Sequence, residues 1–333
     1  MDTHDSRRSF LKQSAFAIGA IALSDLDNVA SAFAETPGQS RVYFTTDISS
    51  AGLLKIHEVV SENRTLPGKV AVKLHSGEPG GHHFPDPAII KNLVQSLNGT
   101  IVECNTAYPG GRFDAADHQQ VMVDHGFADI APVDIMDKKG SIRLPFPKGK
   151  HITEDYVGAN FVNYDSFLIL SHFKGHQMGG FGGAIKNMSI GIASGEGKMW
   201  IHTAGGTTSR DDFSVCFSTP QDHFLESMAE AAGAIMNSLG ENLVYINLMN
   251  NLSIDCDCNN NPAPPELEDI GILASLDPVA LDKACVDLVY AADTEKSASL
   301  RERIESRHGM HTLDYAEQLG LGSQTYTMVV IDS

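Results

Sequence analysis

Strand-like and helix-like segments alternate along most of this chain. A β-branched run at residues 70–75 precedes a helix pattern that begins at Asp86-Pro87, and the apolar run at residues 101–106 precedes an amphipathic pattern at residues 116–126. An N-cap aspartate followed by proline is a typical helix start. The alternation predicts parallel βαβ units. Further strands are expected at residues 128–135, 166–173, 242–250, 269–275 and 325–332, with helices at 221–239, from 278 onward and twice more before the last strand.

The composition allows a substantial hydrophobic core. The chain has 333 residues, of which 42% are hydrophobic, enough for one large α/β unit or two domains. The Lys, Gly and Pro content rises between Lys138 and Lys150, which suggests a crossing between lobes. We therefore expect an α/β fold of two lobes, with mainly parallel sheets flanked by helices: an N-terminal lobe at residues 35–150 and a C-terminal lobe at residues 151–333.

Residues 1–34 have the pattern of an export signal. Arg7 and Arg8 precede an apolar run at residues 15–23 that is too short to span a bilayer, and small residues end at Ala34. The pattern resembles a twin-arginine signal peptide, with a cytosolic amphipathic helix as the alternative. It predicts that the twin-arginine export machinery is a partner. The mature protein would be periplasmic or otherwise extracytoplasmic, with no stable membrane insertion after cleavage.

The charge of the chain argues against polyanionic partners. The formal net charge is −18, which repels nucleic acids and anionic membranes, and no basic run lies beyond the N-terminus. Five irregularly spaced cysteines are too few for a disulfide scaffold. We therefore expect a globular protein that is held together by its core and does not bind nucleic acid.

Residues 172–202 surround Lys186 with glycines and histidines. Glycine lets the backbone approach a ligand closely and expose its N–H groups. Hydrophobic residues interleave with these glycines, which is unlike a flexible linker. The block also follows the strand expected at 166–173, and ligands of open α/β sheets bind beyond the carboxyl ends of strands. The pattern predicts a ligand cradle with Lys186 in the first turns of a helix; a surface lysine among turn glycines is the alternative.

A second group of reactive side chains lies in residues 253–285. Cys256 and Cys258 are two positions apart, so they point to one side of an extended segment. Two thiolates can share a metal, but a zinc or iron–sulfur site needs about four ligands. A disulfide to Cys285, or simply buried thiols, are the alternatives. Further ligands for such a site would come from Cys104, Cys285, Asp255 or Asp257.

Loops of the first lobe add weaker candidates. Arg112 is a candidate anion contact. His118 and His125 lie seven positions apart on one face of an expected helix with no third ligand near, and we expect them to be structural. The candidates for a base or a ligand are His75, His82 and His83.

The strings HFKGHQMGGFGGAIKN (172–187) and CDCNNNPAPPELEDIGILASLDPVALDKACVDLV (256–289) resemble the signature blocks of the three-six-two domain-of-unknown-function family. Members are often labelled uncharacterised iron–sulfur centre proteins, and the likeness covers most of the chain after about Lys69. Many members carry a ferredoxin-like insert with C-x-x-C ligands, whereas residues 203–222 here offer only Cys216. The resemblance implies an iron–sulfur cluster or another metal as one possible cofactor.

The first block is also similar to a lobe of the nickel-pincer lactate racemases, which reads His, a Gly-Phe-x-Gly-Gly run, Lys and a later His. In those enzymes the lysine is bonded to a pyridinium-derived nickel cofactor, the later histidine ligates nickel and the earlier one moves a proton. The resemblance implies that Lys186 anchors a nickel-pincer-type nucleotide, His202 ligates the metal and His176 carries a proton. The matching run consists of Gly180, Phe181, Gly182 and Gly183.

Three functional hypotheses follow, each with a small-molecule ligand. The first is an exported isomerase or oxidoreductase that acts on a small hydroxy acid through a Lys-anchored nickel-type cofactor. The second is an iron–sulfur or other metal-binding redox module without substrate turnover, and the third is a binding protein without chemistry. The candidate residues are His176 and Lys186 for catalysis, Lys186, Gly180, Gly182, Gly183 and Arg112 for cofactor binding, and His202, Cys256 and Cys258 for metal binding.

Overall fold

The computed structural model describes residues 39–62 and 65–332. The expected signal peptide at residues 1–34 lies outside the described residues. Within the described ranges, no helix has both the length and the apolar character needed to cross a membrane.

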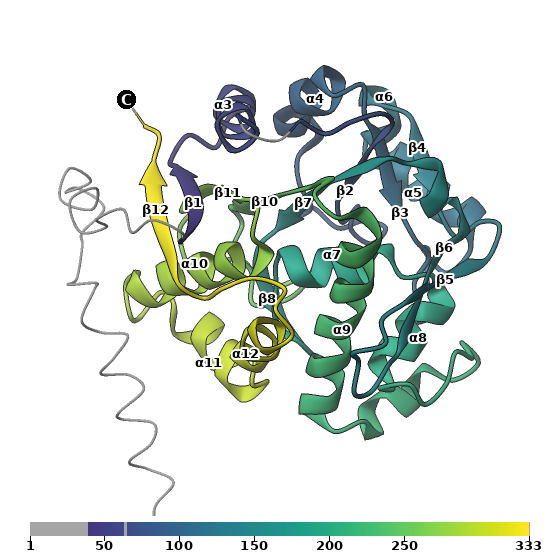
Figure 1. The fold of residues 1–333 in the computed structure, drawn as a ribbon. Helices are drawn as coiled ribbons and strands as arrows, with labels where there is room; N and C mark the ends of the chain where they lie inside the picture. The colour runs from purple at the N-terminus through teal and green to yellow at the C-terminus, as the bar shows by residue number, and fades with distance from the viewer. Residues whose placement is uncertain (1–38, 63–64, 333) are drawn as a thin grey trace, which may run out of the picture.

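One eight-stranded sheet forms the centre of the molecule (Figure 1). All neighbouring pairs are parallel except the two that involve β11. In spatial order the strands are β12 (Tyr326–Val330), β1 (Ser40–Thr45), β11 (Gly271–Ser275), β10 (Leu243–Met249), β7 (Ser166–His172), β2 (Val70–Lys73), β3 (Thr100–Glu103) and β4 (Val133–Ile135).

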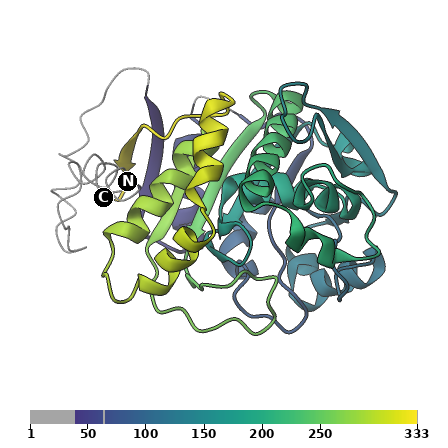
Figure 2. The same ribbon diagram turned by 90° about the horizontal axis from the view of Figure 1, so that it is seen from below.

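Helices cover both faces of this sheet. Figures 1 and 2 show the first group on one face and α7, α9, α10 and α12 on the other. The first group comprises α3 (Ser50–Val60), α4 (Pro87–Ser96), α5 (Ala115–Asp124) and α6 (Phe127–Ile130). The second comprises α7 (Ala184–Ile192), α8 (Gly195–His202), α9 (Gln221–Leu239), α10 (Pro278–Ala291), α11 (Ala298–Ser306) and α12 (Met310–Gln318). Two 3-10 helices, η1 (Ala159–Asn163) and η2 (Phe213–Ser218), complete the helical elements of the described residues.

The two helix layers explain why the central strands are buried at every position. Successive side chains of a strand point to opposite faces. In β7, Phe167 and Ile169 join the core beneath α7 and α10, whereas Leu168 and Leu170 join the core beneath α3 and α4. All seven positions of β7 are therefore buried, as expected for a parallel strand covered on both sides.

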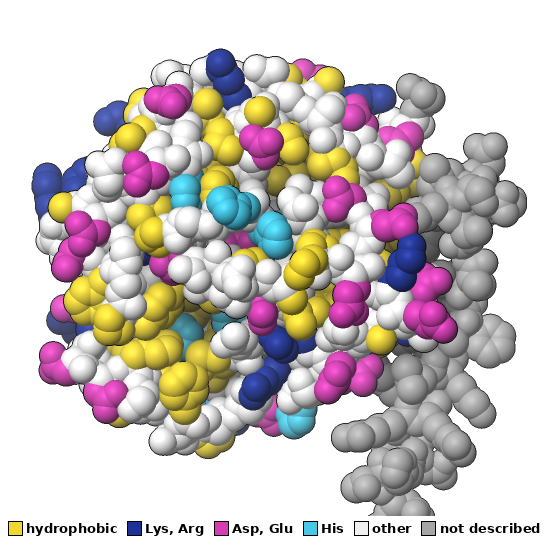
Figure 3. Space-filling model, turned by 180° about the vertical axis from the view of Figure 1, so that it is seen from behind, with side chains coloured by type: hydrophobic (Ala, Val, Ile, Leu, Met, Phe, Trp, Pro, Cys, Tyr) yellow, Lys and Arg dark blue, Asp and Glu magenta, His cyan; other side chains and the backbone are white. Residues whose placement is uncertain are grey.

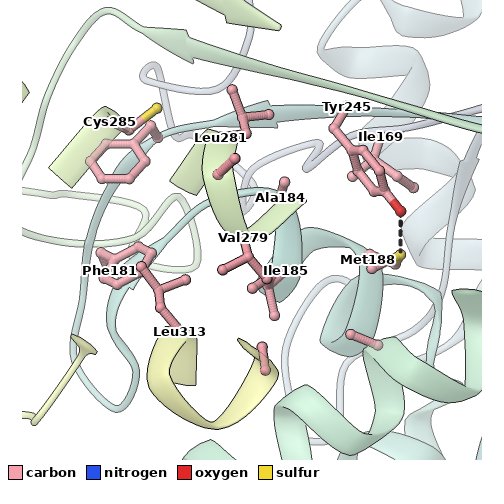
Figure 4. Close-up of a cluster of buried hydrophobic side chains, with 14 of the residues drawn as sticks. Ile169, Phe181, Ala184, Ile185, Met188, Tyr245, Val279, Leu281, Cys285 and Leu313 are labelled. Atoms are coloured by element: carbon pink, nitrogen blue, oxygen red, sulfur yellow. Dashed lines mark hydrogen bonds between the residues drawn. The ribbon is translucent and has the colours of Figure 1, made fainter. Parts of the chain in front are cut away.

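Helix α7 is held against the sheet by the larger core. Figure 4 shows Ala184, Ile185 and Met188 of α7 among side chains from α10, α12 and the strands. The Tyr245 hydroxyl of β10 lies 3.8 Å from the Met188 sulfur. This packing fixes the helix that carries Lys186, so the position of the lysine is set by the core.

The structure confirms the α/β class with a large, mainly parallel sheet flanked by helices. Strands from both expected lobes join this one sheet. The proposed crossing at residues 138–150 overlaps the first strand of a hairpin formed by β5 (Ser141–Pro145) and β6 (Glu154–Gly158).

The strand expected at residues 128–135 is only partly correct. Strand β4 begins at Val133, and the preceding residues form α6. Gly126 adopts a left-handed conformation, with φ of 79°, where α6 begins. Phe127 and Ile130 are three positions apart, so they share one helix face in the second core instead of alternating.

Candidate active site

The candidate site is a cavity of about 80 Å³ at the carboxyl ends of the parallel strands. Strands β2 and β3 end at Lys73 and Glu103, and β7 leads into the glycine-rich block through a hairpin of β8 (Lys174–His176) and β9 (Gly180–Gly182). The reactive or ionisable side chains that line the cavity are Lys73, His75, Glu103, Cys104, Tyr108, Arg112, His176, Lys186, Lys198, His202, Cys256 and Cys258.

One end of the cavity contains a group of potential metal ligands. One ligand atom each from His176, Cys256 and Cys258 lies within 4.8 Å of the others. Asp257 points away from this group and accepts hydrogen bonds from buried Lys174 and His172. The segment is not extended, contrary to the sequence prediction, but forms a turn in which the Asn259 N–H donates to the Cys256 carbonyl oxygen at 2.8 Å. Both sulfurs still face the cavity, while the intervening carboxylate anchors the loop.

The two sulfurs have different electrostatic environments. The hydrogen bond from the Cys258 thiol, together with the ammonium groups of Lys186 and Lys174, lowers the pKa of Cys256 well below its usual value. The same contact and burial raise the pKa of Cys258. This contact therefore favours the thiolate form of Cys256 over that of Cys258. A thiolate is the form that binds metals or acts as a nucleophile.

The two candidate histidines present different nitrogen atoms to the cavity. Nδ1 of His176 accepts the backbone N–H groups of Met178 and Gly179, at 3.2 and 2.9 Å, so Nε2 carries the proton of the neutral ring. Nδ1 of His202 lies 2.6 Å from the Lys198 carbonyl oxygen and must donate to it, which leaves a lone pair on Nε2. Therefore His176 offers an N–H group and His202 offers an acceptor.

Both rings are neutral at neutral pH. Burial, reinforced by the nearby Lys186 charge, lowers the pKa of His176 to about 4. Burial also lowers the pKa of His202 to about 3, against the hydrogen bond to the Lys198 carbonyl.

Lys186 lies in the first turn of α7, as the sequence predicts. A Cβ atom added at Gly179 or Gly182 would lie 3.9 or 3.6 Å from its Cδ, so these two glycines flank the lysine stem. Among the described residues, no carboxylate lies within ion-pairing distance of its ammonium group. The lysine therefore brings to the cavity a positive charge without a carboxylate partner, and this charge favours the thiolate form of Cys256.

The other glycines of the block are explained by packing within the chain. A Cβ atom at Gly183 would lie 2.3 Å from Asp282 Oδ1, and one at Gly180, where φ is +81°, would lie 2.8 Å from the Gly309 Cα. Asp282 accepts the amides of Ala184 and Ile185 at 2.7 and 3.0 Å. The N-terminus of α7, which the sequence suggested as part of a ligand cradle, is thus occupied by a carboxylate of α10. Gly180, Gly182 and Gly183 do not line the cavity.

Another part of the cavity wall, called the Glu103 end below, contains a buried ion-pair network. Lys73 donates to Glu103 at 2.8 Å, and Arg112 lies 2.6 Å from Glu78 and 3.7 Å from Glu103. Although burial opposes ionisation, the charge of Lys73 holds the pKa of Glu103 well below its usual value. Arg112 lines the cavity as the sequence suggests, but its guanidinium is already paired with carboxylates of its own lobe.

The family follows from a comparison with known sequences. The family model described as "Domain of unknown function (DUF362)" matches residues 70–287, a range that contains every candidate site residue described above. The chain belongs to the DUF362 family. No curated protein matches the sequence.

Two solved structures are similar to this DUF362 chain at low sequence identity. The lactate racemase apoprotein from Thermoanaerobacterium thermosaccharolyticum is 13% identical, with a TM-score of 0.43 over 77% of this chain and 59% of that chain. A protein from Thermotoga maritima is 12% identical, with a TM-score of 0.40 over 70% and 58% of the two chains. The DUF362 chain thus spans less than two thirds of the length of either structure.

The remaining sequence candidates fall into two groups. His75 lines the cavity, whereas His82 and His83 do not. His118 and His125 are structural, as expected: His118 is fully buried, and His125 stacks on Phe84 at 4.2 Å.

All five cysteines are free, so the disulfide alternative is wrong. Cys285 lies 3.4 Å from the Asn247 amide, away from the cavity. Cys256 and Cys258 meet His176, while His202 lies on the same cavity wall but outside that group.

Sequence analysis of this DUF362 chain missed Lys73, Glu103, Lys198 and Asp282. The first two end apolar strand runs, VAVK and IVE. A charged residue at the carboxyl end of a buried strand was therefore an available signal. Lys198 and Asp282 lie within helices and do not end an apolar strand run, so they have no comparable local signal.

Proposed function

We propose that this chain is a metal-dependent enzyme that acts on a small hydroxy acid, as an isomerase or an oxidoreductase. The observation that carries the proposal is the pair of thiols, Cys256 and Cys258, beside the His176 imidazole on the wall of one buried cavity, with one atom of each within 4.8 Å of the others. Thiolate and imidazole ligands suit zinc, nickel and iron better than magnesium or calcium.

Cys256 and Cys258 are the residues that would hold the metal. Their sulfurs face the same side of a loop that Asp257 fixes to Lys174 and His172. His202 presents a nitrogen lone pair to the same cavity and is the further candidate ligand. A metal bound there would supply a Lewis acid for a hydroxyl or carboxylate oxygen.

His176 is the proposed proton carrier. Its Nδ1 is used by two backbone N–H groups, so Nε2 is the nitrogen that can exchange a proton with a ligand. Because those amides hold the ring in place, the imidazole is already oriented before a ligand arrives. This fixed orientation is what a general acid or base requires.

A nickel-type nucleotide anchored on Lys186 fits the structure only in part. The unpaired amine and its two flanking glycines suit a covalent anchor. However, about 80 Å³ holds roughly five to eight water-sized spheres, which is too little for a nucleotide. The amides of Ala184 and Ile185 are also occupied by Asp282. We therefore assign no step to this cofactor, and its presence would require the cavity to open.

Metal analysis of protein purified from its native host tests the proposal. We expect a transition metal in the parent and its loss in Cys256→Ser and Cys258→Ser. Cys216→Ser is the matched control, because Cys216 is also buried but does not line the cavity. A metal-free parent, or equal metal content in all variants, would contradict the proposal. Iron with acid-labile sulfide would favour the redox module, and a mass addition on Lys186 would favour the nucleotide.

The proton step is tested with small hydroxy acids in deuterated water. We expect the parent to exchange or transform the hydrogen on the hydroxyl-bearing carbon, as followed by NMR. His176→Gln is expected to keep the metal but to lose about 10²–10⁴-fold in rate. An unchanged rate in this variant would exclude His176 as the proton carrier.

Export is a separate part of the proposal and is supported by the Arg7-Arg8 pair and the small residues that end at Ala34. Replacing both arginines by lysine is expected to leave unprocessed precursor in the cytoplasm. Cell fractionation with N-terminal sequencing measures this. Normal amounts of processed protein outside the cytoplasm would show that the twin-arginine assignment is wrong.

A further inference from the structure

The cavity is positively charged although the chain is acidic. The formal net charge is −18, and Figure 3 shows acidic side chains spread over one face of the molecule. In contrast, Glu103 is the only carboxylate among the described residues that line the cavity. The lysine and arginine side chains on its wall are Lys73, Arg112, Lys186 and Lys198. A cationic pocket in an acidic protein attracts small anions selectively.

Two of these cations are neutralised within the chain. Lys73 is paired with Glu103, and Arg112 is paired with Glu78 and Glu103. Lys186 and Lys198 have no carboxylate within 4.0 Å in the described part of the chain. The Lys186 charge already stabilises the Cys256 thiolate, so Lys198 is the better partner for an anionic ligand.

Lys198 is built into the wall more rigidly than a surface lysine. Only 8% of its surface is exposed, and its Nζ donates to the carbonyl oxygens of Ala193 and Cys104 at 2.6 and 3.3 Å. An ammonium group has three donors, so one donor has no acceptor among the described residues. Burying a charge with only neutral partners is costly, which a ligand anion would offset.

The nearby acidic groups do not supply the missing partner. Asp137 accepts the backbone amides of Asn105 and Gly195, and Glu103 accepts from Lys73. Both carboxylates act on the Lys198 charge from beyond ion-pairing distance. The remaining donor of Lys198 therefore stays available at the cavity wall.

We propose that Lys198 binds the carboxylate of the substrate and thereby sets which end of the substrate faces the thiol and imidazole groups. His202 lies one helical turn after Lys198 on α8, and its Nδ1 is held by the Lys198 carbonyl oxygen at 2.6 Å, so the two side chains are fixed relative to each other. The inference rests on the proposed function for the reaction, but the binding of the anion needs no metal.

The size and lining of the cavity define the class of ligand. A volume of about 80 Å³ suits a short organic anion of roughly six non-hydrogen atoms. Ala107, Ile190 and Phe213 give part of the wall an apolar character. A carboxylate on a short carbon chain fits both features, whereas inorganic phosphate would leave the apolar part of the wall without a partner.

Calorimetric titration of metal-stripped protein tests the proposal with sodium lactate, acetate and inorganic phosphate as probes. We expect the parent to bind lactate and Lys198→Met to bind it at least about tenfold more weakly, because a charge-assisted hydrogen bond is lost. Methionine keeps the length of the buried stem. Lys283→Met is the control, since Lys283 pairs with Asp287 outside the cavity, and its lactate affinity should match that of the parent.

Three results would overturn the assignment of Lys198. The first is equal lactate binding by Lys198→Met and the parent. The second is no lactate binding by the parent up to about 10 mM, which is ten times the upper end of usual KM values. The third is tighter binding of phosphate than of lactate by the parent.

If Lys198→Met does not fold, a crystal structure of the parent grown with lactate decides. The carboxylate must lie within hydrogen-bonding distance of Lys198 Nζ, and a carboxylate placed elsewhere refutes the proposal.

The metal content of Lys198→Met separates this inference from the proposed function. A variant that keeps its metal but loses lactate binding supports both. A metal-free parent that still binds lactate through Lys198 would contradict the metal site alone. A metal-loaded parent that does not bind lactate would contradict the carboxylate site alone.

Discussion

The two ends of the cavity differ in how their charges are satisfied. At the Glu103 end, Lys73 and Arg112 have carboxylate partners within the chain. At the Cys256 end, Lys186 has no carboxylate partner among the described residues. The Cys258 thiol there donates a hydrogen bond that favours the thiolate form of Cys256. Paired buried charges hold the fold together, whereas unpaired ones cost stability and are tolerated where a ligand uses them. We therefore assign a structural role to the charges of the Glu103 end and a role in ligand chemistry to those of the Cys256 end.

The largest expected effect is at Glu103. Glu103→Gln would leave Lys73 buried without a counter-charge, because Lys73 is almost fully enclosed. We expect the free energy of unfolding to fall by about 3–5 kcal/mol, measured by urea denaturation. Glu268→Gln, which removes an exposed partner of Lys296, is expected to cost at most about 1 kcal/mol. Similar losses in the two variants would remove the distinction between paired core and surface charges.

A smaller, pH-dependent effect is expected at Asp282, beneath the Cys256 end. Burial, opposed by hydrogen bonds from Ile185, Asn247 and Ala184, raises the pKa of Asp282 from 3.8 to about 6. The folded state therefore holds this proton more tightly than the unfolded chain. The stability that it contributes is fully present below pH 3.8 and is lost as the pH rises through about 6.

The corresponding variant is Asp282→Asn, which cannot titrate. Between about pH 4 and pH 7 the parent should lose roughly 2–3 kcal/mol of unfolding free energy relative to the variant. Urea denaturation of both proteins across this range measures the difference. If the unfolding free energies of the two proteins changed with pH in parallel, Asp282 would titrate as an ordinary carboxyl, and its burial beneath α7 would not raise its pKa.

A third effect separates the glycines that serve packing from those that flank Lys186. Gly183→Ala places a Cβ atom 2.3 Å from Asp282 Oδ1, and we expect a loss of about 1–3 kcal/mol. Gly182→Ala is the matched control, because its Cβ atom would meet only Lys186 Cδ at 3.6 Å. Thermal and urea denaturation should rank the two variants in this order. If Gly182→Ala were the less stable variant, contact with the Lys186 stem, and not with Asp282, would be what excludes a side chain at these positions.

The smallest effect on stability is expected at Lys186 itself. Lys186→Met keeps the stem between Gly179 and Gly182 and removes a charge that has no carboxylate partner among the described residues. The free energy of unfolding should change by no more than about 0.5 kcal/mol, while turnover of hydroxy acids is lost. A destabilisation as large as that of Glu103→Gln would place Lys186 with the structural charges and end the contrast between the two ends.

Local patterns predicted the elements well where the signal was short-range. Asp86 and Asp277 cap α4 and α10 through their side chains, as the Asp-Pro pairs indicate. The turn before β4 was misjudged, because the apolar spacing of α6 fits one short helix as well as a strand. The antiparallel insertion of β11 between β1 and β10 was also not predictable, since strand order depends on pairing between distant segments.

The candidate site was predictable to a similar extent. The placement of Lys186 in the first turn of α7 follows from neighbouring residues. The Cys256 and Cys258 sulfurs do lie together, but they do so through a turn and not through the extended segment that their spacing predicts. The occupation of the α7 N-terminus by Asp282 does not, because the contact joins residues 98 positions apart. A glycine-rich loop before a helix looks the same in sequence whether its amides face a phosphate or a carboxylate of the same chain.

The sequence by itself determined the α/β class, the capped helices and the residue types available for chemistry, because these depend on periodicity and on groups within a few positions of one another. Only the tertiary structure decided which charges are neutralised. Lys73, Lys186 and Lys198 are all lysines near glycines or strand ends in the sequence, yet only Lys73 has a carboxylate partner within ion-pairing distance in the described residues. The physical reason is that ion pairing depends on distances of a few ångströms between atoms that the chain brings together from 30 or more residues away.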